Sequence, residues 1–257
     1  MSFRLYADLG NMTLHWGVFV EGEWLAVDRI SAGDDLARCA VASLNAMLQD
    51  AHMTLDGCSG GLLCSSSPRL TPQLVAALKQ HAGLALPELD EATSARVPTL
   101  YHDPRQIGRD RLANAAAVRA YHECPAIVAD VGSCITVDLI DADGVLVGGA
   151  IAPGLPAMKA GLAAQTPHLG PALDALAPPI DFSTPGRSTE ECIALGIYAS
   201  LAAATRGLCE HLSRGLGDVP VLMTGGDAAW VQSVTGFADV VDGMLTLKGL
   251  QSLDRDE

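Results

Sequence analysis

The hydrophobic and polar positions in the first 30 residues predict three short strands. Apolar-rich segments cover residues 3–10, 14–20 and 24–30, and Glu21-Gly22-Glu23 separates the second from the third. Segments of this length, bounded by glycine and charged residues, are typical of antiparallel strands joined by tight turns. The chain therefore opens with a predicted β-meander.

A second set of three strands is predicted in the middle of the chain. The apolar run 126–129 ends at Asp130, a turn follows at Gly132, and residues 134–140 leave that turn as another strand. Asp143-Gly144 is then a strong hairpin signal. We expect a third strand after it, which ends in a glycine-rich segment.

The two sets share a local motif. Ala7-Asp8-Leu9-Gly10-Asn11 in the first corresponds to Ala129-Asp130-Val131-Gly132-Ser133 in the second. A carboxylate at a strand end can face a hydrated cation, and the N–H groups of the following turn can face phosphate oxygens. Asp-x-Gly alone is a common turn, but two copies in matching strand context favour duplicated half-domains with a ligand held between them.

The rest of the chain adds helices and two more strands. Apolar residues at helical spacing over 34–49 predict a helix, and Thr71-Pro72 predicts a capped helix start leading to about His81. Further predicted elements are strands 60–64 and 219–223, an extended segment 97–101, helix 108–120, a short helix with Met158 and Leu162, an irregular segment 166–185, and helix 190–214. This order predicts two α/β domains, residues 1–120 and 121–257.

Three polar segments are candidates for binding or catalysis. Gly108-Arg109-Asp110-Arg111 begins a helix, where Asp110 either stabilises the helix N-terminus or faces a polar substrate, and both interpretations stay open. Ser188 or Thr189 is a natural cap for the long helix that follows. Thr224-Gly225-Gly226 ends the last strand with another glycine loop, which alone is weak evidence.

Composition limits the possible partners. The formal net charge of −14 provides no basic field for nucleic acid or anionic membranes, so neither is expected as a main partner. The most apolar window, 192–204, is too short to span a bilayer, and residues 1–20 lack the pattern of a secretory signal. We therefore expect a cytoplasmic protein.

The seven cysteines are scattered and contain no Cys-x-x-Cys pair. This pattern is typical of reduced, mostly buried side chains and not of a disulfide framework or a zinc site. Cys134 lies beside the second Asp-x-Gly turn, where a reactive role competes with a packing role.

These motifs together resemble one family, the type III pantothenate kinases of the acetate and sugar kinase, Hsp70 and actin superfamily. The resemblance covers nearly the whole chain and is carried by DLGN at Asp8, SSSP at Ser65, Tyr101 before GRDR, DVGSCITVD at Asp130, GGAIAPGL at Gly148, GRST at Gly186, TGG at Thr224 and LTLKGL at Leu245.

The resemblance implies a fold and an activity. The fold would be α/β, with two duplicated ribonuclease H-like (actin-like ATPase) domains and a nucleotide cleft between them. The activity would be ATP-dependent phosphorylation of pantothenate, the first step of coenzyme A biosynthesis. The implied cofactors are ATP, Mg²⁺ and a monovalent cation, K⁺ or NH₄⁺, and the implied assembly is a homodimer. The apolar face of helix 190–214 is a candidate dimer surface, with burial inside its own domain as the alternative.

The resemblance also implies roles for individual residues. Asp110 matches the general base. The pantothenate-binding positions are Tyr101, Gly108, Arg109, Asp110, Arg111 and Thr189, and the metal ligands are Asp8 for magnesium and Asp130 for the monovalent cation. The ATP-binding positions are Asp8, Leu9, Gly10, Asn11, Met12, Thr13, Leu14, His15 and Ser133. The chain has no Walker lysine motif, because backbone turns would hold the phosphates.

The sequence departs from the family pattern at the first phosphate turn. Met12 stands where the family has a threonine that contacts phosphate, and Thr13 is one position away, on the other face of a strand. Ser133 and Cys134 are milder changes, and Arg109 adds a charge beside Asp110. These departures leave two alternatives open: a non-catalytic relative that binds a ligand or partner, and a kinase of the superfamily acting on another hydroxylated acid or sugar.

Overall fold

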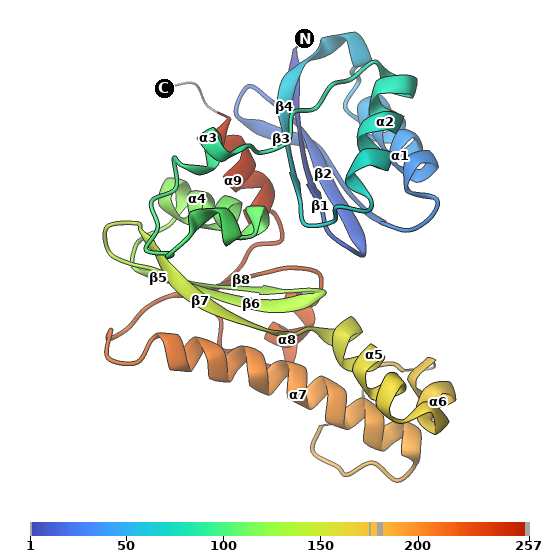
Figure 1. Ribbon diagram of the computed structural model, residues 1–257, viewed down its shortest axis with the longest axis vertical. Helices are drawn as coiled ribbons and strands as arrows, with labels where there is room; N and C mark the ends of the chain where they lie inside the picture. The colour runs from blue at the N-terminus through green and yellow to red at the C-terminus, as the bar shows by residue number, and fades with distance from the viewer. Residues whose placement is uncertain (1, 175, 179–181, 255–257) are drawn as a thin grey trace. The chain divides into compact units, whose positions relative to one another are not determined.

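The computed structural model describes residues 2–174, 176–178 and 182–254, and its first sheet contains the predicted meander (Figure 1). Strands β1 (Phe3–Leu9), β2 (Thr13–Val20) and β3 (Glu23–Ser31) are consecutive antiparallel neighbours. Strand β4 (Cys58–Ser65) pairs in parallel with β1, so the order is β3-β2-β1-β4. The three predicted strands and the strand at 60–64 are confirmed.

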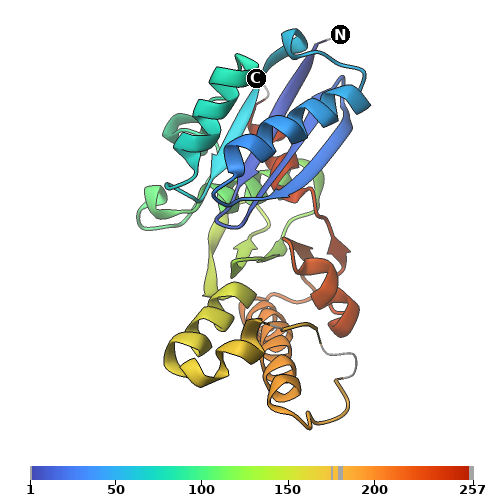
Figure 2. The same cartoon turned by 90° about the vertical axis from the view of Figure 1, so that its right-hand side faces the viewer.

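Helices α1 (Leu36–Asp50) and α2 (Thr71–Ala82) cover one face of this sheet (Figure 2). Alternate residues of β1, including Leu5 and Leu9, are buried against them in one hydrophobic core. The other β1 positions face α4 (Arg109–Tyr121) and α9 (Leu245–Leu253), where Arg4 forms an ion pair of 2.7 Å with Asp254. The short helical segments η1 (Leu55–Gly57), α3 (Glu91–Ser94) and η2 (Pro104–Gln106) lie in the connections.

The second sheet repeats the topology of the first. Strands β5 (Ala126–Val131) and β6 (Cys134–Ile140) form an antiparallel pair, and β7 (Leu146–Pro153) lies on the far side of β6. Strand β8 (Val221–Thr224) pairs in parallel with β5, which matches the β1–β4 pair, and β9 (Val240–Val241) extends this edge. The duplicated α/β fold is confirmed by this shared strand order.

Helix α7 (Thr189–Leu212) is the longest element of the second sheet's unit. Leu201 and Cys209 on one side of α7 pack with strands β5, β6 and β8 in a second core. By length and composition α7 could cross a membrane, but a core helix of a soluble protein meets the same criterion, and much of its apolar face is buried here. The other helical segments of this unit are α5 (Leu155–Gln165), η3 (Pro167–Leu169), α6 (Gly170–Asp174) and α8 (Ala228–Thr235).

The chain divides into two compact units, and the first contains two later segments that the predicted division placed in the second domain. The first unit holds residues 2–124, 144–146 and 244–254 of the described chain, and the second holds 125–143 and the described part of 147–243. The sequence-based division at residue 120 therefore lies close to residues 124 and 125, where the chain first passes from one unit to the other. It did not anticipate the return of the C-terminal helix α9, which packs on α4 so closely that a Cβ at Gly249 would lie 1.8 Å from the Ala113 carbonyl oxygen.

Three local predictions need correction. Helix α2 begins at Thr71 with Leu70 as its N-cap, because the Thr71 hydroxyl donates to Ser65 Oγ or the Ser67 carbonyl and does not cap the helix. The segment 166–185 contains η3 and α6 and is not wholly irregular, although residues 175 and 179–181 lie outside the described part. All seven cysteines are free as predicted, but only Cys64 and Cys209 are buried.

Candidate active site

A row of polar side chains crosses the first sheet at the level of Asp8. Asp8 lies opposite His15 on β2 and Cys64 on β4, and His15 lies opposite Arg29 on β3. Because residues directly opposite each other share a face of the sheet, these four side chains lie on the face away from α1 and α2. The repeat motif therefore carries its carboxylate on the same face as helix α4.

Cys64 is hydrogen-bonded to Asp8, and the charge of the predicted base, Asp110, also acts on it. Its thiol is fully buried and donates a hydrogen bond of 3.7 Å to Asp8 Oδ1. Burial raises the pKa of Cys64 well above its usual range, the Asp8 and Asp110 carboxylates raise it further, and Arg109 acts in the opposite direction. The predicted magnesium ligand and the predicted base thus both lie close to one buried thiol, which sequence reasoning did not single out.

The start of helix α4 sets the position of the Asp110 carboxylate. Asp110 is in the first turn, and its Oδ1 accepts the backbone N–H of Arg111 at 2.9 Å. Gly108 is the N-cap residue, and a Cβ there would lie 2.5 Å from Asp110 Oδ1. Glycine at this position therefore leaves the space that the carboxylate occupies.

Arg111 and Tyr101 form a second pair beside Asp110. The Arg111 guanidinium is buried, donates to Tyr101 Oη at 2.9 Å and lies 5.3 Å from the centre of the tyrosine ring. A buried arginine on an aromatic ring is a strong partner for a carboxylate, because its charge is only partly hydrated. The structure brings Tyr101, Gly108, Asp110 and Arg111 together as predicted for one site.

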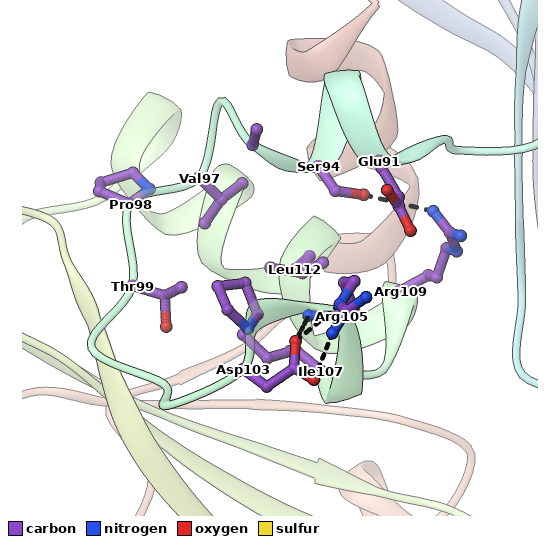
Figure 3. Close-up of a pocket in the computed structure, with 12 residues that line it drawn as sticks. Glu91, Ser94, Val97, Pro98, Thr99, Asp103, Arg105, Ile107, Arg109 and Leu112 are labelled. Atoms are coloured by element: carbon purple, nitrogen blue, oxygen red, sulfur yellow. Dashed lines mark hydrogen bonds and ion pairs between the residues drawn. The ribbon is translucent and has the colours of Figure 1, made fainter.

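Arg109 points elsewhere. Its guanidinium donates to the Leu89 carbonyl and lies 3.4 Å from Ser94 Oγ, which ties α3 to the first turn of α4 (Figure 3). It lines a cavity of about 520 Å³ whose apolar wall includes Val97, Ile107 and Leu112. Tyr101, Asp110 and Arg111 are not among the residues lining this cavity. The charge of Arg109 is therefore held apart from the Tyr101–Arg111 pair.

The first turn is open to solvent. Asn11, Met12 and Thr13 are exposed, with Met12 at 54% of its free surface. Leu9 and Leu14 are fully buried in the core, so only their backbone groups are available to a nucleotide. A Cβ at Gly10 would meet nothing nearer than the Thr13 carbonyl oxygen at 3.5 Å. The Gly10 N–H donates to the Thr13 carbonyl within the turn at 2.9 Å, and the exposed residues 11–13 remain accessible to a ligand.

The second turn is enclosed by two glycine loops. A Cβ at Gly154 would lie 2.0 Å from the Gly132 carbonyl oxygen, and one at Gly225 would lie 2.5 Å from Asp130 Oδ1. Gly225 has a φ of +97°, and the nearby Asp227 N–H donates to the Val131 carbonyl at 2.9 Å. The close approaches are thus made by Gly154 and Gly225. Gly132 itself has open space at its Cβ position, so its role in the turn is not steric.

Thr189 lies in a groove on the second unit. Ser188 caps α7 by accepting the Glu191 N–H at 3.2 Å, so Thr189 is the first helical residue and not the cap. The groove is lined by polar residues that include Arg187 and Thr189 and by the apolar side chains of Met158, Leu162, Ile193 and Ile197. Helices α5 and α7 form its walls. The alternative interpretation of Thr189 as a cap is therefore excluded.

The residues present fit cations that share their ligands with phosphate and water. In the described part of the chain, no three His, Cys, Asp or Glu side chains gather as a metal site. Magnesium is commonly held by one or two carboxylates together with phosphate oxygens, which Asp8 at its strand end can provide. The Asp130 carboxylate lies close to the Gly225 backbone, since a Cβ there would be 2.5 Å from its Oδ1, and its oxygens are ligands of the type that hard cations bind.

Comparison with known sequences decides the family. The family model described as type III pantothenate kinase matches residues 4–211. The chain belongs to the type III pantothenate kinase family. Type III pantothenate kinases of Thermomicrobium roseum and Thiobacillus denitrificans are each 31% identical to it, over 95% of this chain and 94% of the first relative, and over 98% of this chain and 96% of the second. It is thus a kinase that phosphorylates pantothenate in coenzyme A biosynthesis.

Solved structures support the fold of this family member. The activator of 2-hydroxyisocaproyl-CoA dehydratase from Clostridium difficile has a TM-score of 0.58 at 13% identity, covering 98% of this chain and 92% of that one. Component A of (R)-2-hydroxyglutaryl-CoA dehydratase from Acidaminococcus fermentans has a TM-score of 0.55 at 16% identity, covering 98% and 96%. The pantothenate kinase therefore has the actin-like ATPase fold that its strand order indicates.

Proposed function

We propose that this pantothenate kinase uses ATP, with Asp110 as the general base. The observation that carries the proposal is the Asp110 carboxylate, which accepts the Arg111 N–H in the first turn of α4, next to the buried Arg111–Tyr101 pair. In the reaction, the primary hydroxyl of pantothenate forms a bond to the γ-phosphorus as the bond to the ADP oxygen breaks. The proton of the hydroxyl passes to the Asp110 carboxylate.

Pantothenate binding rests on the groups around Asp110. The buried Arg111 guanidinium, supported by Tyr101, would bind the substrate carboxylate, and Gly108 keeps Asp110 within reach of the hydroxyl. Thr189, with its hydroxyl at the end of the α5–α7 groove, is the further binding position. Arg109 would contribute to pantothenate binding indirectly, because its guanidinium contacts Ser94 and so holds α3 against the start of α4.

Nucleotide and cation binding rest on the two turns. The phosphates would be bound by N–H groups and side chains of the first turn, from Asp8 to His15, and by Ser133 in the second. Asp8 would hold Mg²⁺, which neutralises phosphate charge. Asp130 would hold K⁺ or NH₄⁺. These cations matter in a protein of net charge −14, whose overall field opposes binding of a nucleotide.

The groove on α7 is also the surface that supports a homodimer. Its lining includes the apolar side chains of Met158, Leu162, Ile193 and Ile197 together with the proposed substrate residue Thr189. A second copy covering this groove would remove these side chains from water and would close the pocket around Thr189. We expect a cytoplasmic homodimer that binds neither nucleic acid nor membrane.

The test is phosphorylation of pantothenate by Asp110→Asn. We expect turnover to fall by about 10³-fold, because the amide cannot accept the proton, while pantothenate binding measured by calorimetry is retained. Asp103→Asn is the matched control, since Asp103 lies in the same connection but pairs with Arg105 at 3.0 Å. Full activity of Asp110→Asn would remove Asp110 as the base.

The same assay tests the non-catalytic alternative. That alternative is motivated by Met12, an exposed residue of the first turn. Wild-type protein that binds pantothenate but shows no turnover with any nucleotide or cation would support an accessory role. Turnover on a sugar in preference to pantothenate would instead contradict the substrate assignment.

A further inference from the structure

Arg29 on strand β3 is a cation on the reactive face of the first sheet that no motif assigned. Its Nη2 lies 3.3 Å from Nδ1 of His15, and His15 lies directly opposite Asp8. His15 stands between Arg29 and Asp8 in the register of the sheet, so the contact with His15 directs the guanidinium from the edge strand over β2, toward the side of Asp8. β3, β2 and β1 lie side by side in this order in Figure 1.

The Arg29 guanidinium has N–H donors that are available to a ligand. Among the described residues it has one hydrogen-bond partner, His15, and it is in no ion pair with a carboxylate. The other arginines of this face are engaged: Arg4 with Asp254, Arg109 with Leu89 and Ser94, and Arg111 with Tyr101. Arg29 is also exposed, so a ligand can reach it.

His15 orients Arg29 without a charge of its own. A guanidinium only donates hydrogen bonds, so Nδ1 must accept, and the imidazole is the tautomer with its proton on Nε2. Burial, and then the charge of Arg29, lower the pKa of His15 to about 4, which keeps the ring neutral at neutral pH. His15 is thus a buried acceptor that holds the guanidinium on the face of Asp8.

We propose that Arg29 binds a phosphate oxygen of the nucleotide, with His15 as the residue that positions it. A phosphate bound over Asp8 and the β1–β2 turn would lie beside this guanidinium, and an arginine matches phosphate oxygens geometrically. Arg29 would supply the positive charge that the Walker lysine supplies in other kinases. The inference rests on the proposed use of ATP at the first turn.

The experiment measures ATP, ADP and adenosine binding to the full-length chain by calorimetry, with adenosine followed by competition. Arg29→Ala is expected to weaken ATP and ADP binding about 10- to 100-fold and to leave adenosine binding unchanged, because only the phosphates lose a charge-assisted contact. Arg29→Lys is expected to recover part of the affinity. Arg38→Ala is the control, since Arg38 is an exposed arginine on α1, on the opposite face, paired with Asp35.

The positioning role of His15 is tested by a double-mutant cycle. His15→Leu is expected to weaken ATP binding several-fold when Arg29 is present and to have no further effect in the Arg29→Ala background. A merely structural role would instead give the same loss of affinity in both backgrounds. Circular dichroism checks folding, and Arg29→Met replaces Arg29→Ala if the alanine variant is unstable.

The outcomes separate this inference from the proposed function. Wild-type protein that does not bind ATP would contradict the use of ATP itself. Wild-type binding and Asp110-dependent turnover, with ATP affinity of Arg29→Ala within twofold of wild type, would overturn only the role of Arg29. Equal losses for ATP and adenosine would also overturn it, because the contact would then not be with phosphate.

Discussion

The two copies of the Asp-x-Gly hairpin share a topology but differ in their surroundings. In the first, Asp8 lies in a row with His15 and Cys64, and the turn that follows is open to solvent. In the second, Asp130 lies opposite Thr136 and Thr224, and two glycine loops close around the turn. The duplicated fold therefore has two carboxylates at equivalent strand ends, and their neighbouring residues differ.

The neighbours of each carboxylate explain the difference in chemistry. Asp8 accepts a hydrogen bond from the buried Cys64 thiol, on which the charge of the proposed base Asp110 also acts. Asp130 has Thr136 and Thr224 as its cross-strand neighbours, and the Gly225 backbone lies close to its carboxylate. In this account the first copy takes part in phosphoryl transfer and the second holds the nucleotide and its cation.

The largest effect that separates the two copies is expected from glycine substitution. Gly154→Ala places a Cβ 2.0 Å from a backbone oxygen, which cannot move cheaply, so we expect a loss of about 3 kcal/mol in the free energy of unfolding. Gly10→Ala in the open turn should cost no more than about 1 kcal/mol. Urea denaturation of both variants measures this. Equal losses would contradict the contrast between a closed and an open turn.

A fall in pH is expected to lower the free energy of unfolding by a comparable amount, because of His15 in the first copy. The pKa of His15 is lowered in the folded protein to about 4, so the unfolded chain binds the proton first as the pH falls below 6.5. Folding stability is therefore fully present above pH 6.5 and declines between pH 6.5 and 4, by up to about 3 kcal/mol for this group. In denaturant titrations of nucleotide-free protein, His15→Leu should reduce this dependence. An unchanged pH profile would show that His15 is not buried as a neutral ring.

A smaller effect, on catalysis alone, is expected from Gly108→Ala. The new Cβ would lie 2.5 Å from Asp110 Oδ1, and a flexible carboxylate can turn away at little cost in stability. The base would then be misplaced, so kcat should fall about 10- to 100-fold with the melting temperature nearly unchanged. Unchanged kcat would mean that the orientation of Asp110 in the free protein is not the reactive one.

The sequence predicted those parts of the fold that depend on local pattern. The strands around Asp8 and Asp130 were found because alternation, Gly-containing turns and the repeated motif are all encoded within short segments. The location of α9 was not predicted. Its packing on α4 depends on Gly249 fitting against Ala113, which is a contact between distant parts of the chain.

The candidate site shows the same limit. Asp110 and Arg111 were found as a charged motif at a helix start, and the family resemblance supplied their roles. Cys64 and Arg29 were not found, because each joins the site only through strand register, which places it in the row of Asp8. Exposed and half-buried residues alternate along β3 in the structure, but polarity does not alternate along its sequence, so no local signal showed which face Arg29 takes.

The central claim, that the first copy performs the chemistry and the second holds the cation, is tested most directly by potassium titration of pantothenate phosphorylation. We would compare wild type, Asp130→Asn and Asp110→Asn at fixed Mg²⁺ and ATP. The account predicts that Asp130→Asn shifts the potassium requirement to higher concentration while activity remains at saturation, and that Asp110→Asn stays inactive at every concentration. Potassium dependence that is identical in wild type and Asp130→Asn would contradict it.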